Sequence, residues 1–111
     1  MRTAEREGRG RVPAHPEVGD VSLQQVLEAL VDPVRRGIVR ELYASDEDRA
    51  CGTFDLTVSK STATHHFNVL REAGLIRQRY VGTSRMNTLR RNEIEAVFPG
   101  LLDALLARGE A

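Results

Sequence analysis

The sequence predicts a mainly α-helical domain with a two-stranded β-hairpin near its C-terminal end, in the order α-α-α-α-β-β-α. Helix caps stand in front of apolar residues at helical spacing, and a glycine-containing turn separates two short strand-like segments. Aromatic residues make up only 5% of the chain, so aliphatic side chains must build the core, which favours packed helices. With 111 residues, the chain has room for one domain.

Composition narrows the class of protein. The chain is 41% hydrophobic and 29% charged, which is typical of a globular protein. No apolar run is long enough to span a membrane and no secretion signal is visible, so we expect a cytoplasmic protein with no membrane partner. Residues 1–20 mix Arg, Glu, Gly and Pro without apolar periodicity and are predicted to be a flexible N-terminal tail, which leaves residues 21–108 as the folded domain.

Two helices are predicted at the start of this domain. Ser22 and Gln25 form a capping-box pair in front of a helix over about 23–31. Asp32 followed by Pro33 begins a second helix that ends near Tyr43. The polar stretch 44–52 is expected to be a solvated connection.

The remaining elements are shorter. Apolar residues at positions 54, 56 and 58 predict a third helix of at most a couple of turns. Ser59 caps a fourth helix over 60–73, which Gly74 ends. Segments 75–81 and 86–91 are predicted strands of a hairpin with a basic tip. From Asn92 the apolar pattern is helical again, with Pro99 expected to bend the helix or start a new turn.

Charge is segregated along the chain although the formal net charge is zero. Between Ser59 and Asn92 there are seven basic residues and one acid, Glu72, whereas the stretch from Glu41 to Asp55 has five acids and one arginine. A basic half is what a phosphate-binding surface requires, so double-stranded DNA is the expected partner.

The helix over 60–73 has one apolar face and one polar face. Ala63, Phe67 and Leu70 point toward the core at 100° per residue. The opposite side is short, polar and mostly uncharged, which suits hydrogen bonds to base edges and phosphates, and Lys60 adds positive potential at the start of the helix. An isolated helix with this face could be an ordinary solvated helix. The polar-face residues are Ser61, Thr64, His65 and Asn68.

A capped helix, a glycine stop and a basic-tipped hairpin, in that order, outline a winged helix-turn-helix domain, in which the hairpin is the wing. The segment STATHHFNVLREAGLI, residues 61–76, resembles the recognition helix and first wing strand of the ArsR family of bacterial repressors. ALVDPVRRGIVREL, residues 29–42, resembles that family's second helix, and the match extends over about 23–106.

The resemblance implies a homodimer, formed by the first and last helices, that binds a near-palindromic operator and usually blocks transcription. It also implies a set of residues that face the DNA. Within this set, His66 lies at the edge of the apolar face and is equally compatible with a histidine packed in the core. Thr62 likewise lies near the edge of the polar face. That implied set is Ser61, Thr62, Thr64, His65 and His66, with Arg85 at the wing.

Dimerisation also has support from the residues themselves. The last helix is apolar around too much of its circumference for a terminal element, and pairing it with the first helix across a two-fold axis would bury the excess. The alternative is that the helix folds back onto its own subunit. The expected dimer residues are Leu23, Val26, Leu27, Leu30, Leu101, Leu102, Leu105 and Leu106.

No cofactor or metal is expected. Members of the family that bind thiophilic metals use a pair of cysteines, of which this chain has only one, Cys51. A second kind of family site uses histidine on the last helix, and no histidine follows His66 in this chain. Cys51 is interpreted as a structural residue; a redox role and a two-ligand site with His15 remain open alternatives. The residues imply no particular effector.

The rival function is a winged-helix module that binds another protein rather than DNA. An enzyme is not expected, because no phosphate loop, metal-ligand set or nucleophile paired with a base is present. The residues do not identify the operator or decide between repression and activation.

Overall fold

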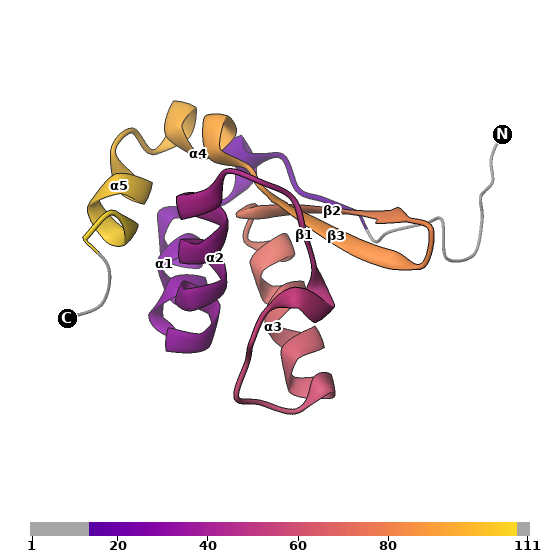
Figure 1. Ribbon diagram of the computed structural model, residues 1–111. Helices are drawn as coiled ribbons and strands as arrows, with labels where there is room; N and C mark the ends of the chain where they lie inside the picture. Colours follow the sequence, from indigo (N-terminus) through magenta and orange to yellow (C-terminus); the bar gives the residue numbers. More distant parts are fainter. Residues whose placement is uncertain (1–13, 109–111) are drawn as a thin grey trace, which may run out of the picture.

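Three helices, a hairpin and two C-terminal helices follow one another in the structure, a computed structural model that describes residues 14–108 (Figure 1). Helices α1 (Leu23–Val31) and α2 (Pro33–Ser45) lie side by side, and α3 (Lys60–Glu72) lies on the other side of α2. The hairpin of β2 (Ile76–Val81) and β3 (Ser84–Leu89) projects away from the helices. The mainly helical winged class is therefore confirmed.

The predicted caps begin the first two helices. Ser22 Oγ accepts the backbone N–H of Gln25 at 3.1 Å, and Asp32 Oδ1 accepts that of Val34 at 2.8 Å. These bonds satisfy amide groups that have no partner inside the helix. Helix α2 continues to Ser45, two residues beyond the expected end, and stops at Asp46 in the left-handed conformation.

The predicted third helix is wrong. The chain from Phe54 to Ser59, where that helix was expected, is not helical; a two-residue strand β1 (Arg49–Ala50) and a 3-10 turn η3 (Cys51–Thr53) precede it. Apolar residues at positions 54, 56 and 58 are spaced by two, which is the period of an extended chain. Phe54 is accordingly buried against the Phe67 ring, at 5.5 Å between centroids, while Asp55 and Thr57 are exposed.

The sheet has three antiparallel strands in the order β1-β3-β2, one more than expected. In the hairpin, Ile76 pairs with Leu89 and Val81 with Ser84, so the turn consists of Gly82 and Thr83. Gly82 has a φ of +63°, which the first position of a tight hairpin turn needs. The added strand comes from the stretch expected to be a solvated connection, because Arg49 and Ala50 pair with Asn87 and Met86.

The C-terminal helical pattern is divided as Pro99 predicted. Helix α4 (Arg91–Val97) ends before the proline, and α5 (Leu101–Leu106) starts after Gly100, whose φ is +82°. Ile94, Leu102 and Leu106 join the core of the subunit.

Half of the residues assigned to the dimer lie instead in this subunit's own core, which corrects that part of the expectation. Helix α5 packs against α2 and buries one of its faces there. Leu23 and Leu27 are exposed, at 45% and 40%, and Leu101 and Leu105 are half-buried. The four residues in the core are Val26, Leu30, Leu102 and Leu106.

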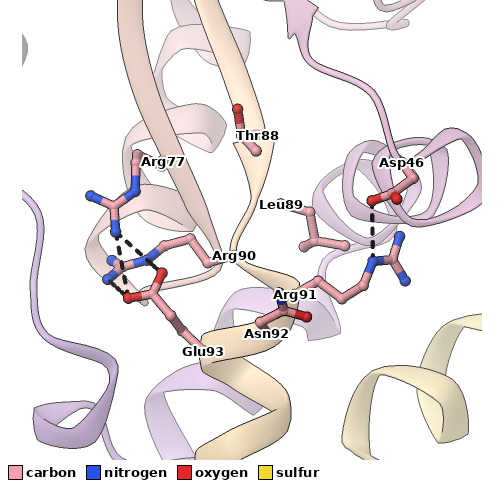
Figure 2. A pocket seen from close by; sticks show the side chains of 8 residues that line it. All are labelled: Asp46, Arg77, Thr88, Leu89, Arg90, Arg91, Asn92 and Glu93. Atoms are coloured by element: carbon pink, nitrogen blue, oxygen red, sulfur yellow. Dashed lines mark hydrogen bonds and ion pairs between the residues drawn. The ribbon is translucent and has the colours of Figure 1, made fainter.

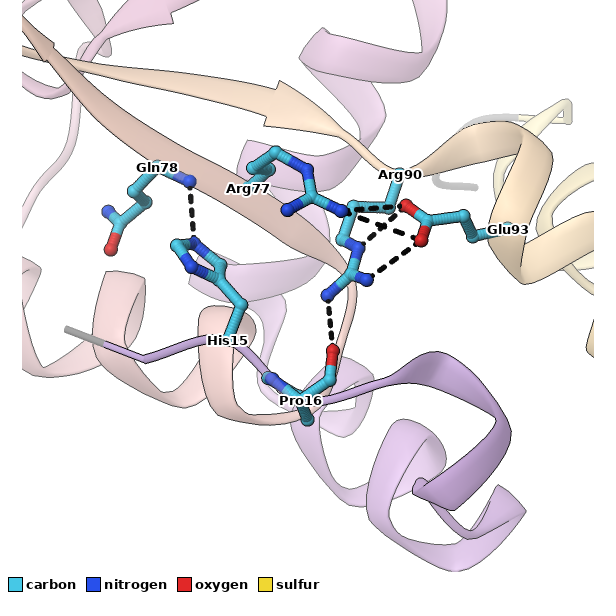
Figure 3. Close-up of polar contacts among 6 residues, drawn as sticks. All are labelled: His15, Pro16, Arg77, Gln78, Arg90 and Glu93. Carbon is cyan, nitrogen blue, oxygen red and sulfur yellow. Dashed lines mark hydrogen bonds and ion pairs between the residues drawn. The ribbon is translucent and has the colours of Figure 1, made fainter. Parts of the chain in front are cut away.

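The segment before α1 also departs from expectation. Residues 14–20 pack on the domain, with a 3-10 turn η2 (Val18–Asp20) that buries Val18. His15 Nε2 accepts the backbone N–H of Gln78 at 2.9 Å, and Arg90 Nη1 donates to the carbonyl of Pro16 at 2.8 Å (Figure 3). The boundary predicted at residue 20 is therefore wrong for 14–20; the rest of the predicted tail lies outside the described residues.

Within residues 14–108, no helix is long and apolar enough to cross a membrane.

Two glycines give a matched test of the backbone. Gly74 has a φ of +78°, and an added Cβ would lie 3.2 Å from Val21 Cγ2, whereas at the helical Gly37 an added Cβ would meet nothing within 4 Å. Gly74→Ala is expected to lower the free energy of unfolding by about 1–2 kcal/mol. Gly37→Ala should raise it by roughly 0.5–1 kcal/mol. Urea denaturation measures both changes, and equal effects would contradict a strained backbone at Gly74.

Candidate nucleic-acid interface

Helix α3 presents a row of small polar side chains at its start. Ser59 caps the helix, with its Oγ accepting the N–H of Thr62 at 3.2 Å. Thr64 donates its hydroxyl hydrogen to the carbonyl of Lys60 at 3.0 Å and keeps its oxygen lone pairs for other donors. These contacts hold the first two turns of α3 in place. The exposed side chains of the predicted set are Lys60, Ser61, Thr62, Thr64 and His65.

His66 is a packed residue, so the assignment of this side chain to the DNA face is corrected. It is 7% exposed, and its Nδ1 lies 3.1 Å from Nη1 of Arg35. A guanidinium only donates, so Nδ1 is the acceptor and the imidazole is neutral. Burial is the main cause that lowers the pKa of His66, which favours the same neutral form.

Arg35 is a site residue that sequence reasoning missed. Its Nε donates to the carbonyl of Ala29 at 2.6 Å, and Nη2 donates to that of Glu28 at 3.3 Å, both at the end of α1. The same side chain therefore joins α1 and α2 to His66 on the recognition helix. In the sequence, Arg35 is one of several charged residues on an amphipathic helix, and no local pattern indicates its hydrogen-bond partners.

The wing carries Arg85 one residue from its turn. Arg85 faces Tyr80 across the hairpin, with its guanidinium carbon 5.9 Å from the centre of the ring. Its Nε has no hydrogen-bond partner within the described part of the chain. Arg85 lies on the same side of the sheet as Gln78 and Asn87, by the alternation of strand residues.

Most of the other arginines of the wing are paired, which reduces the basic surface that the sequence suggested. Three of these paired arginines, Arg77, Arg90 and Arg91, line a cleft of about 400 Å³ at the base of the hairpin (Figure 2). Glu93 binds Arg77 and Arg90, with Arg90 Nε to Oε1 at 2.8 Å, and Arg91 reaches Asp46 at 3.4 Å.

Arg79 on β2 is paired in the same way, with Asp48. Two acids of the stretch 41–55, Asp46 and Asp48, thus neutralise part of the basic segment. Charge counting along the chain missed this because these pairs are far apart in sequence.

The carboxylate at the base of the wing has a strongly shifted pKa. Hydrogen bonds from Arg90, together with those from Arg77, lower the pKa of Glu93 from 4.5 to about 2. Glu93 thereby stays ionised and fixes the junction between β3 and α4.

Cys51 is half-buried beneath the recognition helix. Its Sγ accepts a hydrogen bond from Asn87 Nδ2 at 3.2 Å, and the residue borders a cavity of about 110 Å³ with Lys60 and Phe67. His15 has a different partner, the backbone of Gln78. Residues 14–108 contain no cluster of three or more His, Cys, Asp or Glu side chains suited to a metal ion.

An apolar groove of about 430 Å³ lies between α1 and α5. Leu27 and Val31 line it from α1, and Ala104 and Leu105 from α5. Val31 is 71% exposed, so the groove opens into an apolar surface patch.

Comparison with known proteins agrees with this geometry. Residues 30–79 match the model of a helix-turn-helix domain family. An uncharacterised HTH-type transcriptional regulator of Bacillus subtilis (strain 168), YceK, is 36% identical over 83 residues, covering 73% of this chain and 83% of the relative. The solved structure of an ArsR-like transcriptional regulator from Rhodococcus sp. RHA1 is 26% identical, covers 78% of this chain and 80% of its own, and superposes with a TM-score of 0.59.

The chain belongs to the ArsR family of winged helix-turn-helix transcriptional regulators. A second ArsR family regulator of known structure, 21% identical, has the same fold with a TM-score of 0.61, covering 74% of this chain and 90% of its own. As a member of the ArsR family, the protein is a transcriptional regulator with a DNA-binding domain and not an enzyme.

Histidine burial in this ArsR-family regulator predicts a pH-dependent stability. Burial is the main cause that lowers the pKa of both His15 and His66 below 6.5, so the unfolded chain binds more protons than the folded one just below that pH. This contribution is present above pH 6.5 and is lost as the pH falls below that value. Glu93 acts in a separate window, between about pH 4.5 and 2.

His66→Asn isolates one of these groups, since the asparagine carbonyl oxygen takes the place of Nδ1, accepts from Arg35 and does not titrate. Urea unfolding at several pH values between 5 and 8 should give a smaller slope of stability against pH for the variant than for the wild type. An unchanged slope would contradict the buried neutral histidine.

Proposed function

We propose that the protein is a homodimeric repressor that binds a near-palindromic operator with α3 in the major groove and the wing on the adjacent backbone. The observation that carries this proposal is the exposed, uncharged polar row from Ser61 to His65 on a helix whose other face is fixed to the core. Small hydroxyls and an imidazole hydrogen-bond base edges and phosphates without blocking entry to the groove. Lys60 and Arg85 provide the cationic contacts to phosphate.

The dimer proposal rests on the groove between α1 and α5. Leu23, Leu27 and Val31 are large apolar side chains exposed along α1, and Leu105 borders the same groove. Self-association about a two-fold axis buries such a patch and sets two recognition helices about one DNA turn apart.

The proposed location is the cytoplasm, because a regulator that binds an operator must be in the compartment that contains the DNA.

The first test is the binding of labelled DNA to the protein at several salt concentrations. Candidate operators are obtained by enriching a random duplex library, and an unrelated duplex is the comparison. His65→Ala is expected to weaken operator binding by about 1–2 kcal/mol, since it removes one polar contact with the DNA. Glu47→Ala, on an exposed loop residue, is the control and should bind as the wild type does.

A steep fall of affinity with salt would reflect released counterions. If the wild type binds every duplex equally, or if no duplex is enriched, the operator proposal is wrong. The protein-interaction module is then the better reading.

The dimer has its own test in the mass of the particle in solution, measured by light scattering. Leu27→Asp places a carboxylate in the groove, whose lining also includes Arg36, and is expected to give monomers, because burying a charge in an apolar interface is costly even beside a cation. Val97→Asp is a matched control, since Val97 is 39% exposed on α4 and does not border the groove. Equal masses for both variants would contradict the proposed interface.

A further inference from the structure

A chain of side-chain hydrogen bonds begins at Arg71, near the end of α3. Arg71 is 5% exposed, and its Nη1 donates to Asn68 Oδ1 at 2.8 Å and to Gln78 Oε1 at 3.2 Å. A guanidinium has donors and no acceptor, so both amide oxygens must face it. Arg71 therefore sets the orientation of two amides, one on the recognition helix and one on the wing.

The chain continues across the sheet. Gln78, 1% exposed on β2, donates from Nε2 to Asn87 Oδ1 at 2.8 Å. Asn87, fully buried on β3, then donates from Nδ2 to the carbonyl of Arg49 at 3.0 Å and to Cys51 Sγ at 3.2 Å. All the bonds run in one direction, away from Arg71. Reversing any amide would place two donors or two acceptors opposite each other, at the cost of an unpaired buried polar group.

Asn68 differs from the other two amides because it lies at the edge of the network. It is half-buried on α3, three residues after His65 and four after Thr64, which places the three side chains on neighbouring turns of one face. Its Oδ1 is occupied by Arg71. Its Nδ2 has no hydrogen-bond partner among the described residues, and it is not one of the side-chain atoms buried without a partner. The amide nitrogen is thus available as a donor on the DNA-facing side of the helix.

We propose that Arg71 is a positioning residue for DNA recognition, which holds Asn68 so that its Nδ2 donates to an acceptor atom of the DNA. This inference rests on the proposed function. A free asparagine side chain presents its donor and its acceptor about equally, whereas the bond from Arg71 selects the donor before DNA arrives, and preorganisation of this kind strengthens recognition. The acceptor is a base-edge atom or a phosphate oxygen, and the two differ in their dependence on sequence.

Two substitutions of Asn68 separate the DNA contact from the fold. Asn68→Asp keeps the acceptor for Arg71 and loses the donor, so its melting temperature should equal or exceed that of the wild type. Asn68→Ala loses both groups and should melt at a lower temperature. Both variants are expected to bind the enriched operator about tenfold more weakly, which corresponds to the loss of one hydrogen bond to DNA.

The effect of the added charge is removed by repeating the titrations at high salt. If Asn68→Ala binds the operator like the wild type, and Asn68→Asp is weaker only at low salt, the loss is charge repulsion and the proposal is overturned. Weakening on the operator alone identifies a base edge as the acceptor, and equal weakening on the unrelated duplex identifies a phosphate.

A double-mutant cycle tests whether Arg71 acts through Asn68. Arg71→Met keeps the length of the side chain and removes every donor, so it should reduce operator affinity, but by less than Asn68→Ala does, because the released amide still presents its donor about half of the time. In the Asn68→Ala background, Arg71→Met should cause little further loss. Additive losses would overturn the proposal, because they would show that Arg71 acts independently of the amide.

Arg71→Lys keeps a charged donor and should recover part of the affinity, which makes it a second variant if Arg71→Met folds poorly. Arg79→Met is the matched control, because Arg79 lies half-exposed on the opposite face of β2 and pairs with Asp48.

The failure of this inference is distinguishable from the failure of the proposed function. If the wild type itself shows no operator selectivity, the proposed function is wrong. If the wild type is selective and the Asn68 variants bind the operator equally well, only the role of Asn68 and Arg71 is wrong.

Discussion

The orientation of the recognition helix depends on the side chain of Arg35. Its guanidinium binds two carbonyls at the end of α1 and the imidazole of His66 on α3, so three helices meet at one planar group. Asp32 supports the same junction by capping α2 and accepting the N–H of Arg35 itself at 3.2 Å. With its inner face held in this way, α3 leaves its polar row exposed at a defined angle.

The wing is held by different forces at its two ends. At its base, the ion pairs of Glu93 with Arg77 and Arg90 fix the point where β3 enters α4. Toward the tip, buried amides of β2 and β3 connect the hairpin to Arg71 on the recognition helix. Buried hydrogen bonds consequently join the two DNA-contacting elements of the proposed function, and few arginines are left to bind phosphate.

The elements with local signals were predictable from the sequence. Ser22, Asp32 and Ser59 cap helices where expected, because capping depends on residues three positions apart. The exposed polar row of α3 followed from helical periodicity alone. The extended segment from Phe54 also had a local signal, because its apolar residues are spaced by two. We expected the helical pattern to continue through this segment, so a helix was predicted there instead of an extended chain.

Features that depend on distant partners were not predictable. Helical periodicity left His66 equally compatible with a packed and a DNA-facing histidine, and its contact with Arg35, 31 residues away, favours the packed one. The strand at Arg49 forms only because β3 offers an edge. The packing of residues 14–20 likewise depends on Arg90 and on the edge of β2. Periodicity could not assign Leu102 and Leu106 to the subunit core rather than to a partner, because both environments favour the same apolar residues.

Operator recognition by a symmetric dimer is tested most directly by a hydroxyl-radical footprint of the protein on a duplex enriched from a random library. Two symmetric recognition helices predict two protected patches on one face of the DNA, about 10 base pairs apart from centre to centre, in an inverted repeat. A single unsymmetrical patch would contradict the dimer, and the absence of any protection on enriched DNA would contradict recognition by α3 and the wing.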